Sequence, residues 1–211
     1  MIYELRTYTL KPGAAPAVAK NAGTIARDIR GDDYGKLEGY WMTEIGPLNQ
    51  VMHLWSYDSL DERQRLRNAL GQNKDWTGTY LPLIMPHLLR QDIRLLNPLR
   101  DLHPPAGEGN VYEFRNYRFK PGRIGAWIEA FTGILPVRER YSPLVGLWQT
   151  EAGQPNEACH LWVYPDLNAR AEARAKALAD PEWQRFLGRV VDSLDEMTST
   201  IIIPAAHSRM Q

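Results

Sequence analysis

Two segments of the sequence carry the same charged and aromatic residues at the same spacing. The first has Glu4, Arg6 and Tyr8, and the second has Glu113, Arg115 and Tyr117. Residues two apart on a strand point to one face, so each glutamate lies close enough to pair with its arginine. Such an arginine could bind a carboxylate or another anion, with the glutamate as orienting group or base and the tyrosine as a hydrogen-bond donor. The alternative is an internal network of ion pairs that satisfies buried charge.

A second repeated pattern is His-x-Trp, at His53 with Trp55 and at His160 with Trp162. An imidazole beside an indole could act as an acid or base, or less readily as a metal or haem ligand. No second His or Cys follows at metal-ligand spacing, so we expect no metal site and no cofactor. The alternative is a hydrogen-bonded core histidine.

Aromatic residues supply a further candidate group. Trp41 and Trp148, on neighbouring strands, could join Trp55 and Trp162 in lining a pocket for a flat apolar ligand, although tryptophan is more often plain core. Cys159 is expected to face the helices as a small apolar residue. The sequence has no nucleophile elbow, P-loop or dinucleotide-binding glycine pattern, and it identifies no catalytic residue.

The elements that position these residues occur twice. IYELRTYTLKPG at 2–13 recurs as VYEFRNYRFKPG at 111–122, and WMTEIGPLNQVMHLWSY at 41–57 recurs as WQTEAGQPNEACHLWVY at 148–164. A unit of about 100 residues is the size of a small domain rather than of a solenoid repeat. The chain is therefore expected to hold two copies of one fold.

Each copy is predicted to run strand, helix, strand, strand, helix, strand. Alternating residues at 2–10, 37–45, 50–57 and 88–97 predict strands, and so do 111–119, 144–152, 157–164 and about 197–204. Apolar residues at helical spacing follow each Lys-Pro-Gly, and helix-capping residues stand at Ser59 and Asp166. This order is the ferredoxin-like split βαβ. The domains are expected at 1–98 and 110–205, with a linker at 99–109 and a tail at 206–211.

The central strands have one apolar face and one mixed face. The apolar parity contains Tyr3, Leu5, Met52 and Leu54, and is expected to meet the helices. The other parity carries the charged and aromatic candidates, and so large an aromatic surface needs a cover. The matching face of the other copy is the simplest one. The fold class is therefore predicted as α+β, with two antiparallel sheets facing each other in a pseudo-twofold α+β barrel whose interior holds these candidates.

Composition excludes several partners. Lys and Arg together number 25, as do Asp and Glu, so no basic excess exists to bind nucleic acid. No apolar run approaches the roughly 18 residues of a membrane span, so no membrane insertion is expected. The single cysteine forms no internal disulfide. A cytoplasmic protein is the expectation.

The YELRxYxLKPG opening, the GxWxTExG strand and the HLWxYxSxxxR block resemble the NIPSNAP family, of the dimeric α+β barrel superfamily. The resemblance covers about 1–97 and 110–204; in the second copy Tyr164-Pro165-Asp166 with Arg170 lacks the serine. It implies the barrel fold, and loosely a link to vesicle or mitochondrial processes, but no catalytic residues. Related barrels include cofactor-free monooxygenases, isomerases and haem-handling enzymes. A homo-oligomer is expected by the same resemblance.

Two functions remain open at this point. The first is a barrel that binds a small organic ligand, either as a binding protein or as a cofactor-free enzyme. The second is a non-catalytic scaffold with a filled interior and an outer contact surface. Ala15 and Ala22 in the first copy match Ile124 and Phe131 in the second, so if one pocket is functional, the other copy need not be, and the sequence leaves open which copy it is.

Overall fold

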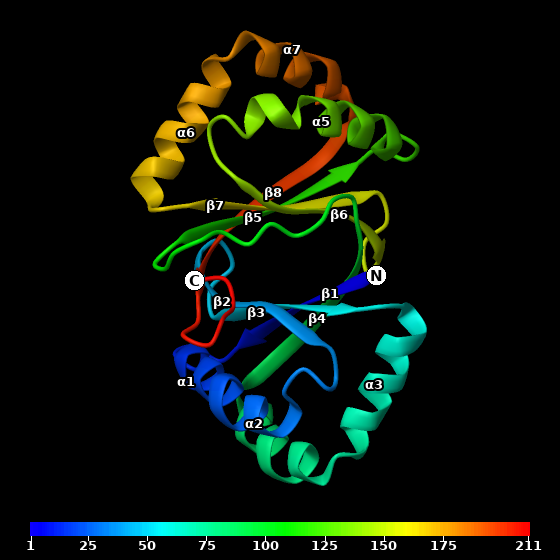
Figure 1. Cartoon of the computed structure of the whole chain (residues 1–211), viewed down its shortest axis with the longest axis vertical. Coiled ribbons are helices and arrows are strands. Elements are labelled where there is room, and N and C mark those ends of the chain that lie inside the picture. Colours follow the sequence, from blue (N-terminus) through cyan, green and yellow to red (C-terminus); the bar gives the residue numbers. More distant parts are fainter.

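A computed structural model describes all 211 residues as one closed eight-stranded barrel with helices on two opposite sides (Figure 1). The strand order around the barrel is β1-β3-β2-β8-β5-β7-β6-β4. The predicted α+β class and tandem βαββαβ architecture are confirmed.

The first half contains four strands and a set of short helices. Its elements are β1 (Ile2–Leu10), α1 (Ala15–Asn21), the π-helical segment η1 (Ala22–Ala26), α2 (Arg27–Arg30), β2 (Lys36–Ile45), β3 (Gln50–Tyr57), α3 (Leu60–Gln72), the π-helical segment η2 (Trp76–Tyr80), α4 (Leu81–Ile84), η3 (Met85–His87) and β4 (Leu88–Pro98).

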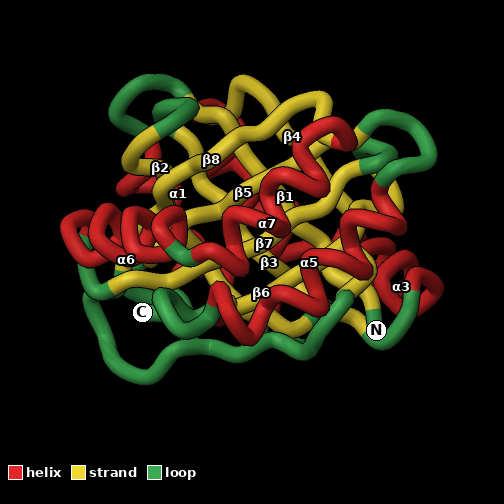
Figure 2. Tube along the Cα trace, turned by 90° about the horizontal axis from the view of Figure 1, so that it is seen from above, coloured by secondary structure: helices red, strands yellow, loops and turns green.

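The second half repeats this order with longer, regular helices, which cover the strands in the view from above (Figure 2). Its elements are β5 (Val111–Phe119), α5 (Ile124–Arg138), β6 (Leu144–Ala152), β7 (Glu157–Tyr164), α6 (Leu167–Ala179), α7 (Pro181–Val190), η4 (Val191–Ser193) and β8 (Leu194–Pro204).

The barrel closes through two seams between the halves. β2 pairs with β8, where Trp41 lies opposite Pro204, and β4 pairs with β6, where Pro98 lies opposite Trp148. Both seams are antiparallel and short, whereas β1 pairs with β4, and β5 with β8, over most of their length. The two sheets therefore form one continuous hydrogen-bonded surface.

Local sequence explains where the elements begin. Gly13 and Gly122 have φ of +80° and +77°, which only glycine adopts freely, so each Lys-Pro-Gly turns the chain from strand into helix. Ser59 and Asp166 each accept a hydrogen bond from a backbone N–H in the first turn of α3 and α6. These predicted caps are confirmed.

The barrel interior is a closed apolar core, and the predicted orientation of the strand faces is wrong. Tyr3, Leu5, Met52 and Leu54 point into the barrel rather than to the helices. Fifteen buried side chains from both halves pack there: Tyr3, Leu5, Trp41, Met52, Leu54, Leu96, Tyr112, Phe114, Val145, Trp148, Cys159, Leu161, Val163, Ile202 and Met210. A sealed interior suits this parity because no helix reaches it to supply partners for charged groups.

The charged and aromatic parity lies instead between each sheet and its own helices. Trp55 and Tyr57 belong to the core of the first half with residues of α1 and η1, and Trp162 and Tyr164 to that of the second half with residues of α5 and α7. The candidates of the two halves are therefore separated by the whole thickness of the barrel and do not form one shared site.

Trp41 and Trp148 lie on the opposite face of the sheet from those candidates because of strand register. Trp41 is opposite Met52, and Trp148 is opposite Cys159, so both indoles share the interior face. Each ring lies over a glycine two residues earlier: a Cβ at Gly39 would lie 2.1 Å from Trp41, and a Cβ at Gly146 would lie 2.2 Å from Trp148. The repeated Gly-x-Trp is thus a packing motif.

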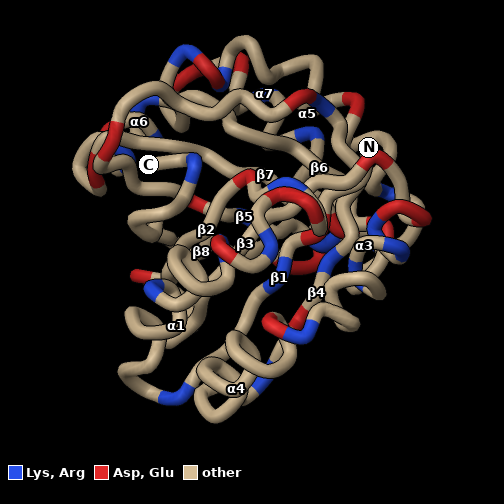
Figure 3. Tube along the Cα trace, turned by 60° about the horizontal axis from the view of Figure 1, so that its bottom comes forward, with Lys and Arg blue, Asp and Glu red and all other residues tan.

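The segments outside the barrel strands are also ordered. In the linker, Leu99 and His103 donate backbone hydrogen bonds to Leu147 and Val145, which extends the β4–β6 seam. The C-terminal tail returns to the barrel, where Met210 is buried in the interior core. Positive and negative residues are interspersed along the chain (Figure 3). No helix has both the length and the apolar character needed to cross a membrane.

Candidate functional site

A cavity of about 360 Å³ lies between the sheet of the first half and its helices. Residues from every element of the first half except α1, together with one residue of the tail, line it: Arg6, Tyr8, Ala22, Ala26, Arg27, Arg30, Leu37, Tyr40, His53, Trp55, Arg67, Leu70, Gly71, Trp76, Thr77, Tyr80, Leu81, Ile84, Met85, Gln91 and His207. This volume is at the low end of the range for small-molecule sites.

Four of the twelve residues proposed from the sequence line this cavity, namely Arg6, Tyr8, His53 and Trp55. Glu4 lies directly behind Arg6 and is fully buried. Trp41 and Trp148 lie in the barrel interior. The remaining five, all in the second half, lie beneath its helices and are described below.

Glu4 is the centre of an ion-pair network. Arg6 Nη1 donates to Glu4 Oε1 at 2.8 Å, and Arg63 of α3 donates to Glu4 Oε2. Burial alone would raise the pKa of the Glu4 carboxyl, but Arg6 and Arg63 outweigh it and lower that pKa. Arg6 also donates from Nε to the Tyr8 hydroxyl at 2.8 Å, so its guanidinium is fixed on the cavity wall.

Arg30 holds a second cation over the indole of Trp55. Its Cζ lies 3.5 Å from the Trp55 ring centroid, and its Nη2 donates to the Tyr34 carbonyl at 2.7 Å. The side chain is 4% exposed, and its Nε has no hydrogen-bond partner. Burial lowers the pKa of Arg30 to about 10. No carboxylate neutralises this charge.

His53 is a neutral hydrogen-bond donor in this arrangement. Trp55 Nε1 donates to His53 Nδ1 at 2.5 Å, and because an indole N–H only donates, the imidazole proton stays on Nε2. Tyr40 stacks on the ring at 5.1 Å between centroids. Burial, followed by the charges of Arg6 and Arg30, holds the pKa of His53 well below its usual value. With its Nδ1 lone pair engaged, His53 offers a donor rather than a base.

The polar residues of the first half described above, Glu4, Arg6, Tyr8, His53 and Trp55, form a layer beneath the helices, and the second half has an equivalent polar layer. Glu113 accepts from Arg170 at 2.6 Å and Ser199 at 2.6 Å, and Arg115 lies 3.5 Å away. Trp162 Nε1 donates to His160 Nδ1 at 2.6 Å, so this histidine is the counterpart of His53. Tyr117 meets His160 edge-on at 4.6 Å between ring centroids.

The space above this layer is filled in the second half. Trp127 and Phe131 of α5 stack at 4.4 Å, and the Phe131 ring lies 5.4 Å from that of His160. Phe186 of α7 closes the group at 5.9 Å from Phe131. His160 is 1% exposed and its Nε2 has no partner. The equivalents of Trp127 and Phe131 in the first half are Val18 and Ala22, which leave the cavity open.

Backbone differences also separate the halves. The helical segment formed by α1, η1 and α2 starts at Ala15, which is 109 residues before the start of α5 at Ile124. It ends at Arg30, which is 108 residues before the end of α5 at Arg138, so the first copy has one additional residue. The π-helical η1 accommodates it. The number of residues between matching positions of the two copies decreases once more between Trp76 and the start of β4, where η2 occurs. π-Helical turns often mark functional sites, and both of these border the cavity.

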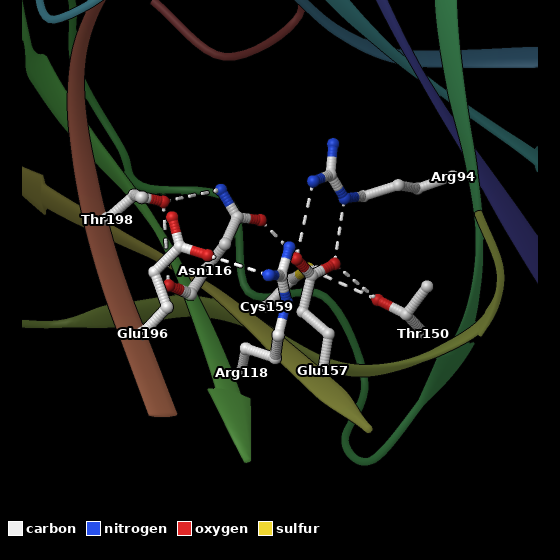
Figure 4. Close-up of polar contacts among 8 residues, drawn as sticks. All are labelled: Arg94, Asn116, Arg118, Thr150, Glu157, Cys159, Glu196 and Thr198. Carbon is white, nitrogen blue, oxygen red and sulfur yellow. Dashed lines mark hydrogen bonds and ion pairs between the residues drawn. The ribbon is translucent and has the colours of Figure 1, made fainter. Parts of the chain in front are cut away.

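Cys159 does not face the helices, contrary to the expectation from the sequence. It lies at one end of the barrel interior in a polar cluster, where its Sγ donates to Asn116 Oδ1 at 3.1 Å (Figure 4). Beside it, Glu157 accepts from Arg94 at 2.7 Å and from Thr150 at 2.8 Å. Because burial and Glu157 raise the pKa of Cys159, the thiol stays protonated. The Arg94–Glu157 pair joins β4 of the first half to β7 of the second.

Several cavity residues were not identified from the sequence. Arg30, Arg67 and Trp76 come from helices, and His207 from the tail. One signal was available for Arg67, because it stands four residues after Arg63 on a helix and so shares its face. His207 has no such signal. It reaches the cavity because Gly23 leaves room for its ring, where a Cβ would lie 2.5 Å from Nδ1.

A sequence model of the NIPSNAP family matches residues 3–102 and 112–209. The chain belongs to the NIPSNAP family. It is 33% identical over 218 residues to human "Protein NipSnap homolog 3B", covering 99% of this chain and 85% of that protein. It is 30% identical to the Dictyostelium discoideum "Protein NipSnap homolog", covering 96% and 87%. The resemblance noted from the sequence is thus confirmed.

Solved structures extend the likeness of this NIPSNAP chain at the level of fold. A putative monooxygenase from Lactobacillus acidophilus has a TM-score of 0.69 at 10% identity, covering 100% of this chain and 98% of that chain. An anthrone oxidase-like protein has a TM-score of 0.68 at 11% identity, covering 99% and 92%. At these identities the comparison concerns the barrel alone.

The geometry explains the motifs by which this NIPSNAP chain was first grouped with its family. The glutamate of the YELR motif pairs with the arginine that ends the HLWxYxSxxxR block, as Glu4 with Arg63 and Glu113 with Arg170. The histidine and tryptophan of HLW hydrogen-bond to each other. The shared motifs therefore build the polar layer beneath the helices, and the cavity above it comes from residues outside them.

Proposed function

We propose that this NIPSNAP-family protein binds a small organic molecule in the cavity of its first half. The cavity is the observation that carries the proposal. Its wall combines the aromatic and aliphatic side chains of Trp55, Trp76 and Ile84 with a few fixed polar groups, as small-molecule sites do. The sequence placed the ligand in the barrel interior, but fifteen packed side chains occupy that space.

The contrast between the halves supports a binding role over a purely structural one. A scaffold needs only a well-packed layer, and in the second half Trp127, Phe131 and Phe186 fill the space over His160. The first half has Ala22 at the position of Phe131 and Ala26 at the end of η1, and it leaves about 360 Å³ unfilled. An unfilled apolar cavity costs stability, so we attribute its presence to a ligand.

The test transfers the residues of the second half to the first. The double variant Ala22→Phe/Ala26→Leu fills the cavity from the helix side. Wild-type protein and the variant are screened against a metabolite library by thermal shift and by ligand-observed NMR. The proposal expects hits that bind the wild type and lose binding in the double variant.

The control is an apolar substitution in the second half of the molecule. Phe131→Leu changes the apolar side chain at the matching position of α5, far from the cavity, and the hits should still bind it. A library with no hit for the wild type, or hits that bind the double variant equally well, would refute the proposal.

A further inference from the structure

We infer that the ligand of this cavity is an organic carboxylate with a flat apolar body, bound with its carboxylate at Arg67. The inference rests on the proposed function, because it specifies the chemistry of the molecule that occupies the same site. It starts from the charges on the wall. Four arginines line the cavity, and no aspartate or glutamate does.

Two of these four arginines already have a carboxylate partner. Arg6 pairs with Glu4 at 2.8 Å, and Arg27 pairs with Asp32 at 2.8 Å. Arg30 and Arg67 have no carboxylate within ion-pair distance, and the Nε of buried Arg30 has no hydrogen-bond partner at all. The wall therefore carries two uncompensated positive charges, one of them almost removed from water. Arg138, the counterpart of Arg30, is also buried over a tryptophan without a carboxylate partner, so the need for a counter-charge is argued from Arg67.

The second half shows what an arginine at this position does when there is no cavity. Arg67 corresponds to Arg174, in the same way as Arg63 corresponds to Arg170. Arg174 lies 3.7 Å from the Glu113 carboxylate and completes its network. Arg67 makes no such contact with Glu4, which is held by Arg6 and Arg63. Its guanidinium is thus available on the cavity side.

The remaining polar groups favour an acceptor in the ligand. His53 keeps its proton on Nε2 and lies on the wall, and Arg6 presents further N–H groups. Arg30 lies between Trp55 and Trp76, at 3.5 and 5.6 Å from their ring centroids, so its guanidinium covers one face of Trp55. A planar apolar body can pack on Trp76, Tyr80 and Ile84, while the arginine fork matches the geometry of a carboxylate.

The experiment compares carboxylates with their neutral amides. The probes are indole-3-acetate against indole-3-acetamide and 2-naphthoate against 2-naphthamide, measured by calorimetry and by saturation-transfer NMR. We expect each carboxylate to bind about tenfold or more tightly than its amide, since hydrogen bonds to charged groups are the stronger kind. The Arg67→Gln variant should lose this preference while still binding both members of a pair.

Arg174→Gln is the matched control, because it removes the equivalent arginine of the second half. It should leave the carboxylate preference unchanged. Equal binding of carboxylates and amides to the wild type, or an equal loss in Arg67→Gln and Arg174→Gln, would overturn the inference while leaving the proposed function intact. If no probe binds and the library screen also finds no ligand, both fail.

Discussion

Ala22 and Phe131 occupy the same position of the duplicated first helix, and they account for the main difference between the halves. The Ala22 methyl group borders the cavity, whereas the Phe131 ring lies over His160 at 5.4 Å between centroids. Together with Val18 in place of Trp127, this substitution leaves the polar layer of the first half accessible to a ligand, whereas protein covers that of the second half. Five predictions concern this layer and the barrel beside it.

The first prediction opens a second cavity. Phe131→Ala removes a buried ring from among Trp127, Phe186 and His160 and should lower the free energy of unfolding by about 3–5 kcal/mol. Urea unfolding followed by tryptophan fluorescence measures it. A change below about 1 kcal/mol would mean that α5 and α7 move into the vacated space. The Phe131 ring would then not explain why the second half is filled and the first is not.

The second prediction concerns closure of the first cavity. Ala22→Phe alone adds a ring where unfilled space exists, so it should not carry the overpacking penalty of roughly 1–3 kcal/mol expected in a filled core. The midpoint of urea unfolding should stay near the wild-type value or rise. A fall comparable with that of a core insertion would show that the cavity does not accommodate the ring.

The third prediction tests the Gly-x-Trp motif. Gly39→Ala places a methyl group 2.1 Å from Trp41, and Gly146→Ala places one 2.2 Å from Trp148, so either ring must move within a filled barrel. Each variant should lose about 1–3 kcal/mol of stability. Gly71→Ala, where nothing lies within 4 Å of the added carbon, is the control and should be no less stable than the wild type. The prediction fails if all three alanine variants behave alike.

The fourth prediction concerns the histidines. Burial lowers the pKa of His53 and His160 well below 6.5, and it lowers that of His207 to about 4. Below about pH 6.5 the unfolded chain takes up protons that the folded chain does not, so stability should fall as pH decreases from 6.5 toward 4. Nitrogen-15 NMR of the imidazoles should show His53 and His160 neutral, with the proton on Nε2, at pH 6. Protonation of either ring near its usual pKa would contradict the buried Trp–His hydrogen bond.

The fifth prediction concerns acid unfolding. Burial alone would raise the pKa of Glu113, but Arg170, Arg115 and Ser199 lower it to about 2. Because the folded-state pKa lies below the unfolded value, this carboxylate stabilises the protein above about pH 4.5, and the stabilisation is lost as pH falls toward 2. Glu113→Gln should cost about 3 kcal/mol at pH 7 and flatten the pH dependence of stability in that window. An unchanged dependence would mean that other carboxylates control acid unfolding.

The sequence predicted the architecture because the repeat and the turn residues are local signals. Lys-Pro-Gly, the helix caps and the alternation of strands each depend on neighbours in the chain, and these gave the βαββαβ order and the barrel. The strand faces could not be assigned in the same way. Glu4 and Glu113 are compatible with the helix side only because Arg63 and Arg170 reach them from α3 and α6, and that complement depends on tertiary structure.

The candidate site was predicted in part for the same reason. Arg6, Tyr8, His53 and Trp55 were chosen for their chemistry, and they do share one wall. The sequence could not identify Arg30 or His207, because their distance from that wall depends on the π-helical turn of η1 and on the course of the tail. The contrast of Ala22 with Phe131 was visible in the alignment of the two copies, but not which copy was left open.

The seams between β2 and β8 and between β4 and β6 carry a last consequence, because they join within one chain what two identical chains would otherwise contribute. In a symmetric pair encoded by a single unit, every mutation appears twice, so a residue that plugs one chamber plugs the other as well. Fusion removes this coupling. One lobe is then free to accumulate bulky side chains and supply rigidity, while its twin keeps an open chamber at the expense of its own packing.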